Sequence, residues 1–277
     1  MEKIKRNERV SAIIAVLCQS PNRTYTLSDF QAMFGSAKSS LSEDIAIAKQ
    51  ILKKYDLGEI HVSTGAAGGV RFVPVESREK SAEFLQMICE KFSDRSRVLP
   101  GGYIYTVDVL STPGYIEHMG EILASRFLGC GADFVITVET KGIIAALMTA
   151  RALNLPLVIL RRDHKLTEGP VVTINYISGT SNRMQTMSIS TRAIKRQQKA
   201  LIIDDFMKGG GTAKAICSIL SEFDAQAVGI GVLIATTEPK FKAVDAYVSL
   251  LELSGIDAQG DIRIQPSAWL YEDERTC

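Results

Sequence analysis

The residues best suited to chemistry lie between positions 199 and 213. An apolar stretch at 200–203, suited to the centre of a sheet, runs directly into Asp204 and Asp205, and a glycine triplet and Thr212 follow. Ligands of open α/β sheets bind at the carboxyl ends of the strands, where adjacent carboxylates accept hydrogen bonds from vicinal sugar hydroxyls. Glycine N–H groups and the positive end of a helix favour a phosphate dianion. The pattern therefore predicts a binding site for a phosphorylated ribose; a tight strand-to-helix turn would explain the glycines alone, but not the two acids.

A second loop, residues 139–142, stands between an apolar stretch at 134–138 and a helical pattern at 142–153. Lys141 and the N–H groups of the helix start can hold a diphosphate while the two aspartates hold the ribose. Taken by itself, Lys141 fits a solvated surface lysine as well. Tyr103 and Phe206 offer flat faces to a ring, although aromatic side chains more often pack in a core. The predicted ligand site comprises Tyr103, Thr140, Lys141, Gly142, Asp204, Asp205, Phe206, Met207, Lys208, Gly209, Gly210, Gly211 and Thr212.

These residues need a sheet to position them, and the chain beyond about residue 81 predicts one. Apolar stretches alternate with helical patterns, as expected for parallel strands joined by crossover helices. Strands are predicted at 103–107, 134–138, 157–160, 171–177, 200–203 and 228–234, and helices at 81–92, 115–128, 142–153 and 212–223.

Residues 1–74 predict a smaller module of three helices and a hairpin. Apolar residues at helical spacing mark a first helix at 10–17, Thr26 is suited to cap a second helix, and Gly35 is suited to end it. Two alternating stretches then flank a glycine-rich turn, which predicts a β-hairpin. Three helices with a short link between the last two, followed by a hairpin, predict a winged helix-turn-helix.

The third predicted helix is the candidate DNA reader. Ser36 is a suitable cap, and Ser40 with Glu43 offers a capping box one turn later. The first turns carry short donors that can approach bases or phosphates in a major groove. Glu43 and Asp44 would repel phosphate, so we expect both to point away from DNA. The predicted DNA contacts are Lys5, Arg6, Ser36, Lys38, Ser39, Ser40, Ser42 and Arg71, although each serine alone fits a cap and each lysine a solvated helix surface.

Composition narrows the class of protein. With 277 residues, 46% of them hydrophobic, the chain accommodates two domains with real cores. The net charge of +1 gives no global basic field, so a nucleic acid must meet a local cluster; residues 1–74 hold ten basic and seven acidic residues. Five scattered cysteines without a Cys-x-x-Cys pair, no apolar signal core and no run long enough to span a membrane predict a cytoplasmic protein. His61, His118 and His164 lack the spacing of metal ligands.

The order of apolar strand, two acids and glycine-rich loop resembles the phosphoribosylpyrophosphate (PRPP) signature of the type I phosphoribosyltransferases, which usually ends in Thr-Gly-Gly-Thr. Gly209 stands where that family usually has Thr or Ser, which removes one hydroxyl from the phosphate cradle, and Lys208 adds a cation before it. Residues 139–142 resemble the family's pyrophosphate loop in position. The stretches 160–165 and 175–183 resemble, also in position, its base-side strand end and flexible loop, whose polar residues fit a mobile lid.

Together with the winged helix, the stretches 99–103, 178–188 and 204–212 resemble the purine operon repressors of Gram-positive bacteria over nearly the whole chain. The resemblance implies an α/β protein with a winged helix-turn-helix domain at 1–74 and a type I phosphoribosyltransferase-like parallel-sheet domain at 75–277.

The same resemblance implies a repressor of purine biosynthesis genes that binds operator DNA and has no transferase turnover. PRPP relieves repression in that family, and guanosine tetraphosphate-type nucleotides can compete for its pocket. No cofactor is then required, although a diphosphate normally brings Mg²⁺. We expect a homodimer, because paired half-sites multiply affinity for DNA.

Two other classes of function fit the sequence. A purine phosphoribosyltransferase with a DNA-binding appendage would explain the nearly complete PRPP motif. Against it, no obvious acid or base stands beside the ribose, because Phe206, Met207 and Lys208 occupy the loop where the enzymes often have small residues. A nucleotide-sensing scaffold that pairs with proteins instead of DNA would use the third helix and the hairpin as its interface.

Overall fold

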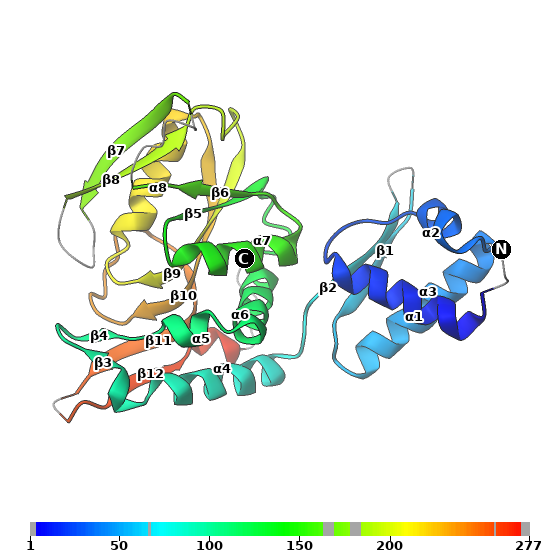
Figure 1. Cartoon of the computed structure of the whole chain (residues 1–277), viewed down its shortest axis with the longest axis horizontal. Coiled ribbons are helices and arrows are strands. Elements are labelled where there is room, and N and C mark those ends of the chain that lie inside the picture. Colours follow the sequence, from blue (N-terminus) through cyan, green and yellow to red (C-terminus); the bar gives the residue numbers. More distant parts are fainter. Residues whose placement is uncertain (1–3, 66–67, 163–168, 178–183, 258, 273–277) are drawn as a thin grey trace. The chain divides into compact units, whose positions relative to one another are not determined.

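The computed structural model describes residues 4–65, 68–162, 169–177, 184–257 and 259–272 (Figure 1). The chain divides into two compact units. The N-terminal unit contains Met1–Ser77 with Arg151–Asn154, and the C-terminal unit contains Arg78–Ala150 with Leu155–Cys277. Within the described residues, no helix is both long and apolar enough to cross a membrane.

The N-terminal unit consists of three helices and a hairpin, as a winged helix requires. Thr26 caps the second helix by accepting a hydrogen bond from the Asp29 N–H, while the Asp29 carboxylate accepts one from the Thr26 N–H at 2.7 Å. Gly35 ends this helix with a φ of 62°, the left-handed conformation that glycine adopts without strain. The elements are α1 (Arg6–Gln19), α2 (Leu27–Phe34), α3 (Lys38–Lys54), β1 (Glu59–Ser63) and β2 (Gly69–Val73), the last two antiparallel.

The predicted cap of α3 is wrong. The residue before the helix is Ala37, which has no side chain to cap it, and the Ser36 hydroxyl donates instead to the Phe34 carbonyl. Because α3 begins at Lys38, Ser40 and Glu43 both lie inside the helix, where no capping box can form. The apolar face of α3 is as predicted: Leu41, Ile45, Ala48 and Leu52 are buried.

The C-terminal unit is built on a six-stranded sheet with the strand order β12-β11-β10-β9-β5-β6. Its strands are parallel, except that β12 runs antiparallel to β11. The sheet strands are β5 (Phe134–Val138), β6 (Leu157–Leu160), β9 (Lys199–Met207), β10 (Gln226–Thr236), β11 (Val248–Ile256) and β12 (Ile262–Pro266). The helices are α4 (Arg78–Phe92), α5 (Val107–Leu110), α6 (Pro113–Ser125), α7 (Gly142–Leu153) and α8 (Gly211–Glu222), with short 3₁₀ turns at Arg95–Arg97 and Ala268–Leu270.

Two predicted strands differ from the structure. Residues 171–177 do form a strand, but β7 (Val171–Ile177) pairs antiparallel with β8 (Met184–Ser190) outside the main sheet and packs against α8 (Figure 1). The predicted strand at 103–107 is only β4 (Tyr103–Ile104), which pairs with β3 (Val98–Leu99), because Val107 already begins α5. The sequence analysis also missed β8, β11 and β12.

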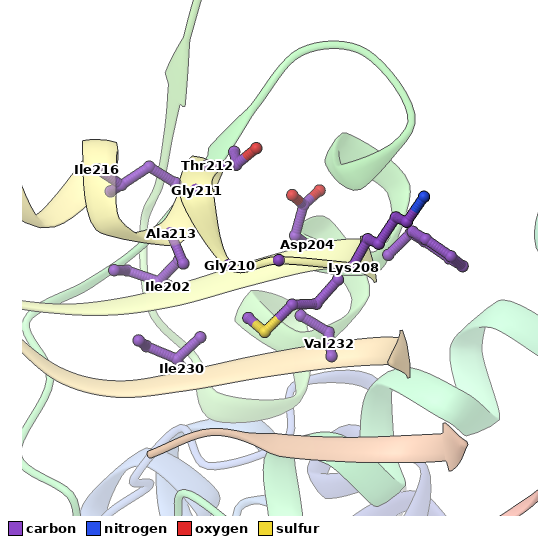
Figure 2. A pocket seen from close by; sticks show the side chains of 13 residues that line it. Ile202, Asp204, Lys208, Gly210, Gly211, Thr212, Ala213, Ile216, Ile230 and Val232 are labelled. Atoms are coloured by element: carbon purple, nitrogen blue, oxygen red, sulfur yellow. The ribbon is translucent and has the colours of Figure 1, made fainter. Parts of the chain in front are cut away.

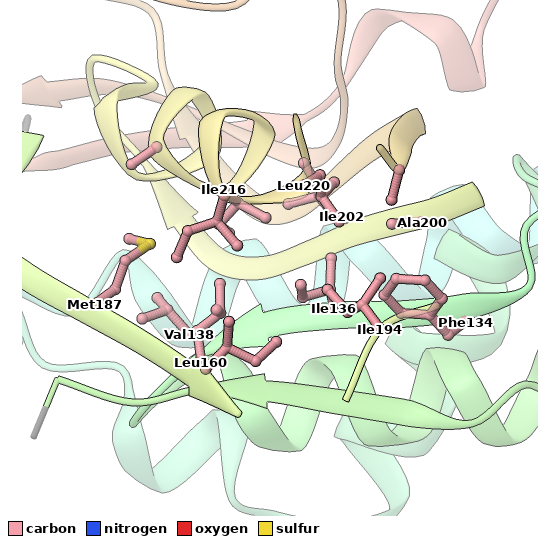
Figure 3. Close-up of a cluster of buried hydrophobic side chains, with 14 of the residues drawn as sticks. Phe134, Ile136, Val138, Leu160, Met187, Ile194, Ala200, Ile202, Ile216 and Leu220 are labelled. Carbon is pink, nitrogen blue, oxygen red and sulfur yellow. The ribbon is translucent and has the colours of Figure 1, made fainter. Parts of the chain in front are cut away.

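The core beneath the ligand-binding edge joins α8 to the sheet. Figure 3 shows Ile216 and Leu220 of α8 beside Ile202 of β9, with Val138 of β5 and Met187 of β8 in the same cluster. All five side chains are at most 5% exposed. This packing holds the start of α8 against the carboxyl ends of β5 and β9.

Candidate ligand site and nucleic-acid interface

An open cavity of about 870 Å³ lies at the carboxyl ends of β5, β9, β10 and β11. It brings together nine of the residues predicted from sequence: Tyr103, Thr140, Lys141, Gly142, Asp204, Asp205, Phe206, Lys208 and Thr212. Further polar lining comes from Thr106, Glu139, Arg162, Gln185, Thr236, Glu238 and Ser254. The two loops predicted to bind phosphate therefore border one space.

The strand β9 presents the two acids because its pairing changes along its length. Its described pairing with β5 ends at Ile202, whereas its pairing with β10 continues to Met207. Asp204 thus follows the point where the β5 ladder stops. A side chain at Gly142 could not be accommodated there, because its Cβ would lie 2.4 Å from Asp204 Oδ1 and 2.6 Å from Thr137 Oγ1. Glycine at this position lets the start of α7 approach the acids.

The pKa of each aspartate in the acid pair is raised above its usual range. Loss of hydration, followed by the charge of Asp205, raises the pKa of Asp204 well above its usual range. Loss of hydration also raises the pKa of Asp205, although the charge of Lys141 partly opposes the shift. In the part of the chain that is described, neither acid forms an ion pair. Ionisation of the pair therefore becomes favourable when a ligand brings donors or a cation.

The glycine loop after β9 lies at the rim of the cavity, between the lining residues Lys208 and Thr212. Gly210 has a φ of 77°, and α8 begins at Gly211, so the first N–H groups of the helix are free of intrahelical partners. In Figure 2 the Asp204 carboxylate and the Thr212 hydroxyl lie on the same side of the end of β9, with the Lys208 ammonium extending beside them. This arrangement offers donors to a phosphate next to acceptors for hydroxyls.

Four of the predicted loop residues do not line this cavity. Met207 is 4% exposed and packs with Ala213 and Val232, so the structure places its side chain in the core. Gly209, Gly210 and Gly211 border a separate void of only about 20 Å³ under the loop. Any contribution of the glycines to a ligand must come from their N–H groups at the rim.

The loop between β5 and α7 is held by its glutamate. The Glu139 carboxylate accepts a hydrogen bond from the Arg162 N–H at 2.6 Å and one from the Arg161 guanidinium at 3.2 Å. The peptide bond between Glu139 and Thr140 is cis. These bonds tie the loop to the end of β6. Lys141 carries positive charge at the cavity beside Asp205, and Arg162 and Lys208 add two further cations to the lining.

Tyr103 and Phe206 both reach the cavity, and Tyr103 is 49% exposed. Sequence reasoning did not select Gln185, Thr236 or Glu238, which line the same space. Gln185 belongs to β8, a strand the analysis missed, and the other two lie at or beyond the end of β10. No local pattern distinguishes such residues from ordinary surface polar groups. Of the predicted lid segments, residues 163–165 and 178–183 lie outside the described residues, as does His164.

The predicted DNA contacts differ in what surrounds them. Lys5, Lys38, Ser39, Ser42 and Arg71 are exposed, whereas Ser36 and Ser40 are half-buried. Arg71 lies on β2 opposite His61 of β1. The first turn of α3 and the hairpin thus present polar, accessible side chains.

Arg6 is engaged within the N-terminal unit. Its guanidinium forms ion pairs with Glu43 and with Asp44, whose carboxylate is fully buried and also accepts a hydrogen bond from Arg9 at 2.7 Å. Asp44 is therefore turned inward, as expected, while Glu43 stays exposed beside Arg6. These pairs fasten the start of α1 to α3.

For metal binding, the described residues contain no group of three or more His, Cys, Asp or Glu side chains that could hold an ion. His61 contacts Glu59 at 3.0 Å, and the His118 ring lies 3.9 Å from the Phe84 ring, centre to centre. The adjacent carboxylates of Asp204 and Asp205 suit a magnesium ion only if a ligand supplies phosphate oxygens, because Mg²⁺ is usually held by one or two carboxylates plus phosphates.

Comparison with known proteins matches both units. The family described as "Bacterial purine repressor, N-terminal" matches residues 5–74, and the family described as "Phosphoribosyl transferase domain" matches residues 108–262. The chain is 42% identical over 269 residues to the purine biosynthesis transcriptional repressor PurR of Bacillus subtilis, covering 97% of this chain and 94% of that protein. It is 39% identical over 254 residues to the purine biosynthesis transcriptional activator PurR of Lactococcus lactis, covering 92% and 94%.

The C-terminal unit alone has enzyme relatives. A xanthine phosphoribosyltransferase of Streptococcus pyogenes is 31% identical over 181 residues, which is 61% of this chain and 90% of the enzyme. The adenine phosphoribosyltransferase structure from Rhodothermus marinus superimposes with a TM-score of 0.52 at 24% identity, covering 62% of this chain and 99% of that one. The structural likeness shows the fold of the sheet unit.

Proposed function

The chain belongs to the family of the PurR regulators of purine biosynthesis transcription, and we propose that it represses purine genes by binding operator DNA and is released by PRPP. The family contains proteins named as repressors and as activators. The single observation that supports the PRPP part most strongly is the cavity that brings together the acid pair, Lys141, and the residues on either side of the glycines, Lys208 and Thr212.

Each part of PRPP has a counterpart at the cavity. The ribose hydroxyls donate to Asp204 and Asp205. Loss of hydration raises the pKa of both carboxyls, so new hydrogen-bond donors favour their ionised forms. The ribose phosphate meets Thr212 and the N–H groups at the start of α8, where the helix dipole favours an anion. The diphosphate meets Lys141 at the start of α7 and brings Mg²⁺, which the carboxylates of the acid pair help to hold. A guanosine tetraphosphate-type nucleotide also carries a ribose and diphosphate groups and would compete for the same space.

DNA binding is assigned to the first turn of α3 and the hairpin. Lys38, Ser39 and Ser42 are exposed on α3, and Arg71 is exposed on β2, so α3 can enter a major groove while Arg71 reaches a phosphate. Arg6, by contrast, holds Asp44 and Glu43 and contributes less charge to DNA. A homodimer would place two such readers on paired half-sites.

We propose that the protein has no transferase turnover. Relatives that match over 92–97% of the chain are named as regulators, whereas the xanthine phosphoribosyltransferase matches only 61% of it. Gly209 also stands where the enzymes usually carry a hydroxyl residue. The enzyme with a DNA-binding appendage is the alternative that the following experiment separates.

The test measures DNA binding to the region upstream of purine synthesis genes, with and without PRPP and Mg²⁺, for wild type and for Asp204→Ala/Asp205→Ala. Wild type is expected to bind and to lose about 5- to 150-fold in affinity when PRPP is present, the usual range of coupling between two sites. The double variant is expected to bind DNA normally but to lose at least about 100-fold in PRPP affinity, because hydrogen bonds to charged groups contribute about 1.5–3 kcal/mol each.

The same samples are incubated with purine bases and PRPP and assayed for nucleotide formation. Nucleotide produced without DNA binding would support the enzyme. DNA affinity that PRPP does not change would refute the effector role, and loss of DNA binding in the double variant would refute the separation of the two sites. Each phosphate contact lowers log K for DNA by about 0.9 per log unit of salt. A DNA affinity that does not fall with salt would therefore favour a protein partner.

A further inference from the structure

The segment between β10 and β11, residues 237–247, forms hydrogen bonds with the backbone of the glycine loop. The Lys242 ammonium donates to the Lys208 carbonyl at 2.6 Å, to the Thr236 carbonyl at 2.8 Å and to Thr236 Oγ1 at 3.3 Å. The Ala243 N–H donates to the Gly209 carbonyl at 2.8 Å. Two successive carbonyls of the loop are thus bound by two successive residues of the segment.

These contacts fix the direction of two N–H groups of the loop, because each peptide group is planar. The C=O and N–H of a planar trans peptide point in opposite directions. Because the Lys208 carbonyl faces Lys242, the N–H of Gly209 points away from the segment. Because the Gly209 carbonyl faces Ala243, the N–H of Gly210 also points away from it. Both donors are thereby directed to the side of the loop opposite segment 237–247.

The close packing at Gly210 supports the same orientation of the loop. A Cβ at this position would lie 3.1 Å from the Ala243 nitrogen and 3.4 Å from Lys242 Cβ, so the loop and the segment pack backbone to backbone. Lys242 is half-buried, and loss of hydration lowers the pKa of its ammonium. Lys242 is not among the side chains that line the cavity in the described structure.

We propose that Lys242 is a positioning residue for the ribose phosphate: it fixes the glycine loop so that the Gly209 and Gly210 N–H groups meet the phosphate. The inference rests on the proposed function, in which this loop receives the phosphate and Lys141 the diphosphate. Without the ammonium, the Lys208 carbonyl keeps only the long contact from the Thr236 hydroxyl at 3.4 Å, and the first peptide of the loop can rotate its N–H out of place.

The test uses full-length Lys242→Met with calorimetric titration of ribose 5-phosphate, pyrophosphate and PRPP in Mg²⁺. The matched control is Lys240→Met, which removes the same charge from an exposed lysine two residues away. For K242M we expect ribose 5-phosphate and PRPP affinities to fall about ten- to a hundredfold, the effect of losing hydrogen bonds from a charged donor, with pyrophosphate unchanged. For K240M all three affinities should stay at the wild-type level.

A general loss of stability would weaken all ligands together, so equal losses for ribose 5-phosphate and pyrophosphate overturn the proposal. No loss beyond that of K240M overturns it too. Wild-type protein that does not bind PRPP would instead overturn the proposed function. If K242M fails to fold, the same comparison is made with Lys242→Arg, whose longer side chain and planar guanidinium do not reproduce the compact ammonium between the two carbonyls.

Discussion

Asp44 in the N-terminal unit is fully buried, whereas Asp204 in the C-terminal unit is half-buried and lines an open cavity. Asp44 is fully buried and receives Arg9 at 2.7 Å and Arg6 at 3.2 Å. Asp204 has another carboxylate as its neighbour, and loss of hydration, followed by that neighbour's charge, raises its pKa. A paired buried charge is part of the fold, whereas a half-buried carboxylate without an ion-pair partner in the described structure marks a place where a ligand completes the pairing.

This contrast makes the two units vulnerable in different ways. In the N-terminal unit, removal of the acid should damage folding. In the C-terminal unit, removal of the acid should damage ligand binding and spare the fold. The three predictions that follow test the contrast, beginning with the largest expected effect.

Asp44→Ala should destabilise the N-terminal unit by about 3–5 kcal/mol, because it leaves the largely buried guanidinium of Arg9 without its partner. Urea unfolding measures the loss, and DNA affinity should fall with it, while PRPP binding stays intact. Glu43→Ala is the matched control, since its side chain is 67% exposed and exposed pairs contribute at most about 1 kcal/mol. Equal losses of stability in D44A and E43A would contradict the structural role of the buried carboxylate.

Gly142→Ala should weaken PRPP binding about tenfold, equivalent to about 1.4 kcal/mol. The added Cβ would lie 2.4 Å from Asp204 Oδ1 and must displace that carboxylate or the start of α7. Gly114→Ala serves as the control, because nothing lies within 4 Å of its Cβ position near the start of α6. Calorimetric titration compares the two; an unchanged affinity in G142A would show that the position of Asp204 is not critical.

Asp204→Asn should stabilise the ligand-free C-terminal unit by about 1 kcal/mol near neutral pH, or about 2–4 °C in Tm for a unit of this size. The folded-state pKa of Asp204 lies well above the ordinary value of an aspartate, about 3.8, so wild-type stability falls as pH rises from about 3.8 towards the raised pKa. The amide does not titrate, so the gap between wild type and variant should grow over that pH range and vanish below it. Thermal unfolding against pH measures the gap, and a constant gap would contradict a raised pKa.

The sequence predicted the local parts of both units well. The cap of α2 at Thr26, the end of α2 at Gly35 and the buried face of α3 all follow from spacing within one or two turns. The strand–acid–glycine–helix order of residues 199–213 likewise places the acids and Thr212 at one cavity, because each step is a short-range rule.

The errors arose where the sequence does not reveal which segment or side chain a residue will contact. Residues 171–177 have the apolar character of a central strand, but their partner is the neighbouring β8, so they form a hairpin outside the sheet. Strands β11 and β12 were missed, and with them the cavity wall that includes Ser254. Arg6 looked like a free cation because its partners, Glu43 and Asp44, lie 37 and 38 positions further along the chain.

The sequence by itself determined the two units, their fold class and the acid–glycine motif, since hydrophobic periodicity and turn chemistry act between near neighbours. Only the tertiary structure decided which cations are already paired, that Met207 faces the core, and that Lys242 binds the carbonyl of Lys208. Those outcomes depend on which distant segments pack together, and a side chain's burial and partners exist only once that packing has formed.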